Sequence, residues 1–295
     1  MHTLTYFHIV ATVIHAVSFT LLLQWSGEDQ QLYQLSIPYA KYSGSDGIST
    51  EHLYHNVMGT FSLLTLLIVN EGITAMSHLS GVIGFAFYRR QMVEDDRHLE
   101  VIRRYVEYAV TAALLEVVLY VLIGGRDFNL LLAIVLTNVV IQVLGYVLER
   151  TANVQRQVYL NLSGFGLLLV PIVSFLTAGA LTEGFLAVSI YYTILYALFG
   201  FHSLLHILSP AWRQFVDKDA GYIVLGVAAK EILTWMAVAL QAKRYEDYGK
   251  PTKSLADNVD LETLLQWLPI GGIAISAVAL LISSRITIQD LYESV

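Results

Sequence analysis

The chain of 295 residues contains no cysteine and few charged residues. Without cysteine, it can form neither a disulfide framework nor a thiolate metal site. Charged residues make up 14% of the chain and hydrophobic residues 56%, whereas a soluble domain carries about 25% charge. The sequence has no basic tract and no zinc-finger spacing, so nucleic acid is not an expected partner. This composition predicts a protein that lies in membrane lipid.

Motifs of hydrolases and of nucleotide-binding enzymes are also lacking. There is no Ser-His-Asp arrangement, no P-loop and no GxGxxG string, and we do not expect an enzyme. His202 and His206 stand at i,i+4, which is a metal-ligand spacing. No acid lies between them in an HExxH pattern, so no metal site is predicted there.

Eight apolar segments are long enough to cross a bilayer, which takes about 20 residues. We read the first as a spanning helix rather than a cleaved signal peptide, because Met1 to Thr5 carry no lysine or arginine. The expected fold is all-α: a polytopic membrane protein with a seven-helix bundle and one additional C-terminal helix. The segments are 4–24, 57–87, 100–123, 128–147, 158–179, 183–208, 219–240 and 263–284.

Two connections are long, at 25–56 and 241–262. In the first, Tyr33, Leu35, Ile37 and Tyr39 alternate with polar residues or proline, a period of two that is typical of a short strand or hairpin arm. Pro38 would restrict such a strand to an edge. An ordered loop without regular structure explains the same residues equally well.

The distribution of cations predicts the orientation in the membrane. With a cytoplasmic N-terminus, ten lysines and arginines fall inside and six outside, four of them in loop 241–262 among acidic residues. Cytoplasmic loops carry the excess of cations, so we expect the N-terminus inside. An even number of helices then places the C-terminus inside as well.

Lys230 lies near the middle of an otherwise apolar segment, YIVLGVAAKEILTW. A charge at the bilayer centre costs about 2.5–3.5 kcal/mol even on lenient scales, so it usually has a partner and a role. The adjacent Glu231 is not that partner, because neighbours at i,i+1 point in different directions. Lys230 is either an amine that forms a Schiff base with an aldehyde or one half of a structural ion pair.

The segment 100–123 carries two acids on opposite faces. Glu107 shares one side with Arg103, Arg104 and Thr111 at helical spacing. Glu116 lies nine residues after Glu107, which is about two and a half turns. If Glu107 faces the bundle centre, Glu116 faces a neighbouring helix, a second subunit or a water path, and it could equally serve as a protonated hydrogen-bonding group.

Two further segments each bring buried histidines. Glu71, Thr74 and His78 fall on one stripe of the second segment, and His8 and His15 share a stripe of the first. A lone histidine in a membrane is usually hydrogen-bonded structure. Two helices with histidines, one also carrying an acid, favour a polar cavity or proton relay.

Polar and aromatic stripes elsewhere suggest a ligand pocket or simple helix packing. Asn138 and Gln142 stand at i,i+4 in the fourth segment. Tyr192, Tyr196 and Phe199 share a face of the sixth and would suit the wall of a flat ligand. Core packing accounts for either stripe as well.

Taken together, these residues resemble the heliorhodopsin family of retinal proteins. A lysine midway along the seventh helix, facing a third-helix glutamate, is the layout of retinal proteins in general. The more specific strings are YIVLGVAAKEILTW around Lys230, RRYVEY around Glu107, IHAV around His15, TNVVIQVLGY around Asn138 and the stretch around His78. The resemblance spans about residues 1–240, and the inverted orientation and long first loop agree with it.

The resemblance implies roles for individual residues. Lys230 would hold all-trans retinal as a protonated Schiff base, with Glu107 as its counterion. His15, His78 and Thr74 would line a hydrated polar pocket on the cytoplasmic side of the Schiff base. Further residues near the chromophore would be Thr111, Asn138, Gln142, Tyr192 and Trp235.

The sequence departs from the family pattern in several places. The family usually has a serine one turn before Lys230, where this chain has Gly226, which removes a hydroxyl and leaves room for water. Pumping rhodopsins carry an aspartate at that place. The segment 263–284 lies beyond the seven-helix fold, and Glu71, Glu116 and Glu231 are additional acids.

The resulting prediction is a light sensor with three parts. Residues 1–240 form the retinal-binding bundle, 241–262 an extracellular linker, and 263–295 an extra helix with a short cytoplasmic tail. A homodimer and an unidentified signalling partner are expected. The alternatives are a light-gated proton channel that uses the additional carboxylates, and a transporter or structural protein without retinal, in which Lys230 is merely ion-paired.

Overall fold

The computed structural model describes residues 3–26, 32–40, 53–87, 93–123, 125, 127–180 and 186–247. Seven of the helices in these ranges are long and apolar enough to cross a membrane. They are α1 (Thr3–Trp25), α2 (Leu63–Phe87), α3 (Val93–Leu122), α4 (Phe128–Arg150), α5 (Val154–Ala180), α6 (Leu186–Leu208) and α8 (Lys218–Asp247). The chain is thus a multi-pass integral membrane protein, as predicted.

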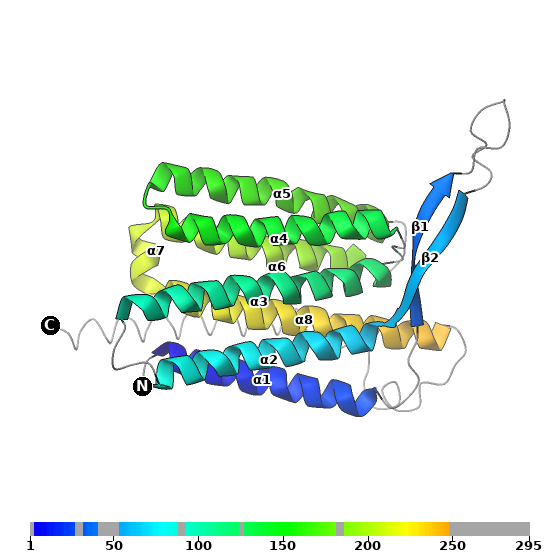
Figure 1. The fold of residues 1–295 in the computed structure, drawn as a ribbon, viewed down its shortest axis with the longest axis horizontal. Helices are drawn as coiled ribbons and strands as arrows, with labels where there is room; N and C mark the ends of the chain where they lie inside the picture. Colours follow the sequence, from blue (N-terminus) through cyan, green and yellow to red (C-terminus); the bar gives the residue numbers. More distant parts are fainter. Residues whose placement is uncertain are drawn as a thin grey trace.

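The long helices run side by side along one axis, and each packs against the next in the chain (Figure 1). The last of them, α8, closes the bundle by contacting α1, α3 and α6. Within its most apolar window, 83% of α8 is buried, against 17% for α4. Side chains of α8 therefore face other helices on nearly all sides, which explains how Lys230 can be held away from lipid.

A short helix, α7 (Pro210–Phe215), turns the chain between α6 and α8. Ser209 caps it by accepting a hydrogen bond from the backbone N–H of Trp212, and Pro210 occupies the first turn, where its missing N–H costs nothing. At the other end of the bundle, Asp127 caps α4 through the N–H groups of Asn129 and Leu130. These caps set the point at which each helix begins.

A β-hairpin extends from the end of the bundle opposite α7 (Figure 1). Strand β1 (Leu32–Ala40) contains the alternating stretch and pairs antiparallel with β2 (Leu53–Ser62). Pro38 lies opposite His55. In a two-stranded sheet both strands are edges, so the missing N–H of proline is tolerated.

The sequence boundary of the second spanning segment was wrong by six residues. Residues 57–62 lie in β2, and α2 begins only at Leu63. Gly59 and Thr60 favour helix weakly, and pairing with β1 satisfies the backbone groups of this stretch instead. The hydroxyl of Ser62 then accepts from the N–H of Thr65 at 3.4 Å, at the start of α2.

The predicted linker and last helix fall largely beyond the described part of the chain. Helix α8 continues through Asp247 rather than ending at 240. The expected helix at 263–284 lies outside the described residues.

Candidate functional site

Lys230 and Glu107 meet at the centre of the bundle. The Lys230 Nζ, from α8, lies 2.5 Å from the Glu107 Oε1, from α3. The same amine donates to the Thr74 hydroxyl of α2 at 3.1 Å. Lys230 and Glu107 are only 5% and 4% exposed, so their charges are screened by little solvent. A buried pair of this kind is favourable only when hydrogen bonds satisfy its remaining atoms.

The second carboxylate oxygen of Glu107 has its own partners. Ser77 donates to Oε2 at 2.5 Å, and Arg103 donates to the same atom at 2.8 Å. Arg103 also forms two hydrogen bonds with Glu100, one turn earlier on α3. Glu107 is therefore fixed by three donors from three helices, which holds the acceptor in one place relative to the amine.

Histidines continue this polar region toward the N-terminal end of α1. His78 Nε2 lies 4.0 Å from Glu107 Oε1. The Nδ1 atoms of His78 and His8 are 2.9 Å apart, and His8 Nε2 lies 3.4 Å from Glu100. The histidines predicted to form a polar cavity are thus brought together around the Lys230–Glu107 pair.

A second group of side chains lies beside the first, which we call the histidine–carboxylate cluster: His15 of α1, Glu71 of α2 and Glu231 of α8. His15 Nδ1 lies 2.6 Å from Glu71 and 3.0 Å from Glu231. The His15 ring stacks on His78, with centroids 5.9 Å apart and planes within 5°. The ligand atoms of the three residues lie within 4.8 Å of one another, an arrangement that a metal ion could also use.

Both carboxylates of this cluster accept further hydrogen bonds. Glu71 accepts from Thr234 at 2.7 Å and from Asn70 at 3.2 Å. Glu231 accepts from Ser18 at 2.7 Å and from the Trp235 indole at 3.0 Å. Glu231 therefore points toward α1 and away from Glu107, although it follows Lys230 directly in the sequence.

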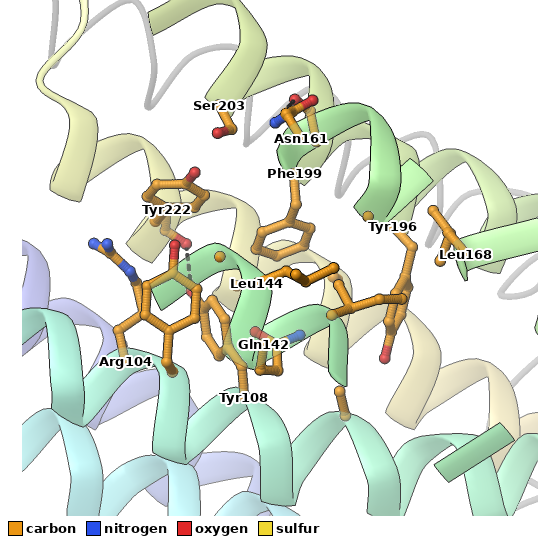
Figure 2. A pocket seen from close by; sticks show the side chains of 18 of the residues that line it. Arg104, Tyr108, Gln142, Leu144, Asn161, Leu168, Tyr196, Phe199, Ser203 and Tyr222 are labelled. Atoms are coloured by element: carbon orange, nitrogen blue, oxygen red, sulfur yellow. Dashed lines mark hydrogen bonds between the residues drawn. The ribbon is translucent and has the colours of Figure 1, made fainter. Parts of the chain in front are cut away.

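An apolar pocket lies on the other side of Lys230, between α3, α4, α5, α6 and α8 (Figure 2). About 1010 Å³ of space free of protein atoms lies within and in front of it, part of it open to the outside. Tyr196, Phe199 and Leu168 form part of its wall, and Lys230 lines it. Of the residues predicted near a chromophore, Gln142 and Gly226 also line this space. The amine thus stands where a largely apolar space meets a set of anions and donors.

Gly226 lies against Tyr108 and also lines the pocket. A Cβ atom at this position would lie 2.6 Å from the Tyr108 hydroxyl oxygen. Tyr108 donates to the backbone carbonyl of Tyr222 at 2.8 Å and places its ring 5.1 Å from the Lys230 Nζ. An aromatic side chain from α3 therefore lies beside this glycine, and the room for water expected there stays a prediction.

Four other predicted residues lie close to this region without lining the pocket. Thr111 donates to the backbone carbonyl of Glu107, one turn back on α3. Asn138 bridges Gln142 and the carbonyl of Ala109. Trp235 lies on the opposite face of α8 with Glu231. The fourth, Tyr192, is buried behind the pocket wall and stacks on Tyr196 at 4.2 Å.

Glu116, for which the sequence left a neighbouring helix, a second subunit, a water path or a hydrogen-bonding role open, lies apart from the histidine–carboxylate cluster. It accepts from the Tyr192 hydroxyl at 2.7 Å and is 1% exposed. It lies on the face of α3 away from Glu107, as the helical spacing predicted. Its neighbour belongs to α6, whereas the histidine–carboxylate cluster is formed by α1, α2 and α8.

Sequence reasoning missed the role of Arg104. Its guanidinium is buried and pairs with both Glu149 of α4 and Asp219 of α8. Lys218 reaches the other oxygen of Glu149 at 3.3 Å. The sequence shows Arg104 in this segment, but its two acidic partners lie 45 and 115 residues away, and no local spacing connects them to it.

Comparison with known families agrees with this geometry. A family model described as Heliorhodopsin matches residues 4–240. This confirms the resemblance found in the sequence, and the match ends where the seven-helix bundle was expected to end. A search of curated proteins found no match.

Proposed function

We propose that this chain, which belongs to the heliorhodopsin family of light-responsive retinal proteins, is a light sensor with all-trans retinal on Lys230 and Glu107 as the counterion. The observation that carries the assignment is the position of the Lys230 amine. Lys230 lines an apolar pocket, and its amine lies 2.5 Å from a buried carboxylate.

The residues present fit such a chromophore. A polyene needs apolar and aromatic walls, which Tyr196, Phe199 and Leu168 supply. A cationic Schiff base needs a nearby anion in a site shielded from water, and Glu107 is 4% exposed. When bound, retinal supplies light absorption and isomerisation.

The protein's own groups hold the charges in place. Ser77 and Arg103 fix the Glu107 carboxylate, and Thr74 accepts a hydrogen bond from the Lys230 amine. Tyr108 lies against Gly226 and places its ring 5.1 Å from the Lys230 Nζ, so an aromatic face stands beside the amine. A change in the distance or orientation between the Lys230 amine and the Glu107 carboxylate alters a hydrogen-bond network that joins α1, α2, α3 and α8. We propose that movement of these helices carries the signal.

The remaining parts of the proposal concern the membrane and the partners. We propose that the N-terminus is cytoplasmic, as the cation distribution indicates. We also propose a homodimer that signals to a separate partner, with no catalytic activity in the chain itself.

Addition of all-trans retinal to the purified protein tests the central assignment. The expected result is a visible absorption band that Lys230→Ala abolishes. Lys218→Ala is the matched control, because Lys218 also lies on α8 but is 31% exposed and pairs with Glu149. Absence of a band in the wild type, or a band that survives in Lys230→Ala, would contradict the proposal.

A second candidate function is passive, light-gated proton transport. It is favoured by the run of polar side chains from Glu100 and His8 to Glu71 and Glu231. Photocurrents under voltage clamp distinguish the two functions. A light-induced current that Glu71→Gln removes would show a channel. If the wild type gives no light-induced current, the light sensor is the supported function.

A further inference from the structure

The histidine–carboxylate cluster is deeply buried, and the retinal assignment gives no role to its two carboxylates. His15 and Glu71 are both 0% exposed, and the Glu231 side chain is 15% exposed. Glu71 lies three residues before Thr74, which touches the Lys230 amine, and this places it about 4.5 Å further along the bundle toward the hairpin. The cluster is therefore a neighbour of the Lys230–Glu107 pair but has separate partners.

The charges of this polar region do not balance without additional protons. Among the residues whose side chains the structure describes, four carboxylates belong to it: Glu71, Glu100, Glu107 and Glu231, whereas the permanent cations are Lys230 and Arg103. The difference is 4 − 2 = 2 negative charges. Unpaired charge is costly at low dielectric, which favours the uptake of protons by this region. The other described titratable groups that face these residues are the histidines of α1 and α2, at positions 8, 15 and 78, and Tyr108 of α3.

The neighbouring polar network shows the contrast. There the cations Arg104 and Lys218 face the anions Glu149 and Asp219. The difference is 2 − 2 = 0, and no additional proton is required. The network around Arg104 is therefore balanced by its own charges, unlike the region that faces α1 and α2.

We propose that His15, Glu71 and Glu231 form a proton-binding site, distinct from the Lys230–Glu107 pair, that holds one exchangeable proton. The His15 Nδ1 is hydrogen-bonded to Glu71 at 2.6 Å and lies 3.0 Å from the Glu231 Oε1, close enough for charge attraction, although that oxygen accepts no hydrogen bond. Thr234 and Asn70 hold Glu71, and Ser18 and Trp235 hold Glu231. Each carboxylate is oriented by neutral donors, and a proton on His15 is stabilised by the hydrogen bond to Glu71 and by the charge of Glu231.

The spacing favours a proton over a metal ion. Ligand atoms around tetrahedral zinc, with bonds of about 2.0–2.1 Å, stand roughly 3.3 Å apart. The separation of His15 Nδ1 and Glu71 is 2.6 Å, a hydrogen-bond distance. The His15–Glu71 separation therefore suits a hydrogen bond and is shorter than the separation of two ligand atoms on one metal ion.

The cluster has a route toward the pair at Lys230 and another toward the surface. The His15 ring stacks on His78, which lies 4.0 Å from Glu107. On the opposite side, the partly exposed Glu231 lies between α1 and α8. The occupied site itself needs no chromophore. Its response to light rests on the proposed function.

Infrared difference spectroscopy between two pH values tests the site on the full chain without retinal. The wild type should show a titration with carboxyl and imidazole bands. Removing one charge 3.0 Å or less from His15 weakens proton binding, and we expect Glu71→Gln and Glu231→Gln each to lower the proton affinity at least about tenfold. The double substitution should abolish the titration, whereas Glu231→Asp should keep it.

Glu116→Gln is the matched control, because Glu116 is an equally buried acid that contacts Tyr192 instead. It should leave the affinity of the cluster unchanged. The same affinity in Glu231→Gln as in the wild type would overturn the proposal. So would a wild-type spectrum that changes on chelation with EDTA and is restored by Zn²⁺, since the occupant would then be a metal ion.

The same variants separate this site from the proposed function. With all-trans retinal bound, light-minus-dark spectra should contain the cluster's bands. If the dark titration behaves as expected but no visible band forms with retinal, the retinal assignment fails and the proton site stands. If the visible band forms but the dark titration is insensitive to Glu71 and Glu231, the proton site fails alone.

Discussion

Replacing Gly226 with serine, the residue usual in the family, should destabilise this protein rather than restore a native contact. The new Cβ would lie 2.6 Å from the Tyr108 hydroxyl oxygen, a separation that no side chain tolerates without movement. Forcing an extra group into a packed interior costs about 1–3 kcal/mol. We expect Gly226→Ser to lower the free energy of unfolding by that amount.

A double-mutant cycle with Tyr108→Phe tests the cause. Tyr108→Phe removes the clashing oxygen, together with a hydrogen bond to the Tyr222 carbonyl. That carbonyl also accepts the helical N–H four residues later, so the loss should fall at the low end of about 0.5–1.5 kcal/mol. With the oxygen gone, the nearest ring atoms lie 3.3 Å and 3.4 Å from the new Cβ. The loss in free energy of unfolding of the double variant should therefore be smaller than the sum of the two single losses by about 0.5–3 kcal/mol.

Denaturant unfolding in detergent micelles, followed by tryptophan fluorescence, measures these differences. Gly166→Ser on α5 is the control, because a Cβ there meets nothing within 4 Å. Strictly additive losses, or a Gly226→Ser variant as stable as the Gly166→Ser variant, would refute the packing argument.

Two further predictions use the same unfolding assay. Arg104→Ala strands Glu149 and Asp219 in a buried site and should cost about 3–5 kcal/mol; a loss below about 1 kcal/mol would mean that solvent already screens these acids. Glu116→Gln keeps an oxygen that can accept from Tyr192, so its stability should lie within about 0.5 kcal/mol of the wild type. A large loss there would show that the charge of Glu116 is needed.

Helical periodicity predicted that the two acids of α3 face opposite ways, and the family resemblance predicted that Glu107 is the one that meets Lys230. The nine-residue separation of Glu107 and Glu116 places them on opposite faces, and the structure gives Glu107 to Lys230 and Glu116 to Tyr192. The reason is that a backbone period fixes the direction of Cβ atoms regardless of the neighbours. The same reasoning correctly excluded Glu231 as the partner of Lys230.

Periodicity failed where side-chain length or a distant partner decides. Arg103 and Arg104 were placed on one side of the helix, but Arg103 turns to Glu107 and Arg104 to acids of α4 and α8. The approach of Tyr108 to Gly226 was not foreseen, because Tyr108 lies 118 residues earlier in the chain. The Arg104 and Tyr108 contacts both lie between helices, which a single helical pattern does not encode.

The surroundings of the Lys230 amine are apolar on one side and polar on the other. Toward α4, α5 and α6 the amine meets a pocket with mostly apolar walls, and toward α2 and α3 it meets Thr74 and Glu107. Glu107 keeps Ser77 and Arg103 as donors if the amine moves. No carboxylate is among the described residues that line the pocket, so a cation displaced toward it meets no comparable acceptor. Separation of the pair therefore costs the cation more than the carboxylate. Under the proposed function, this difference favours release of a proton from the nitrogen toward the acids and histidines of α1 and α2.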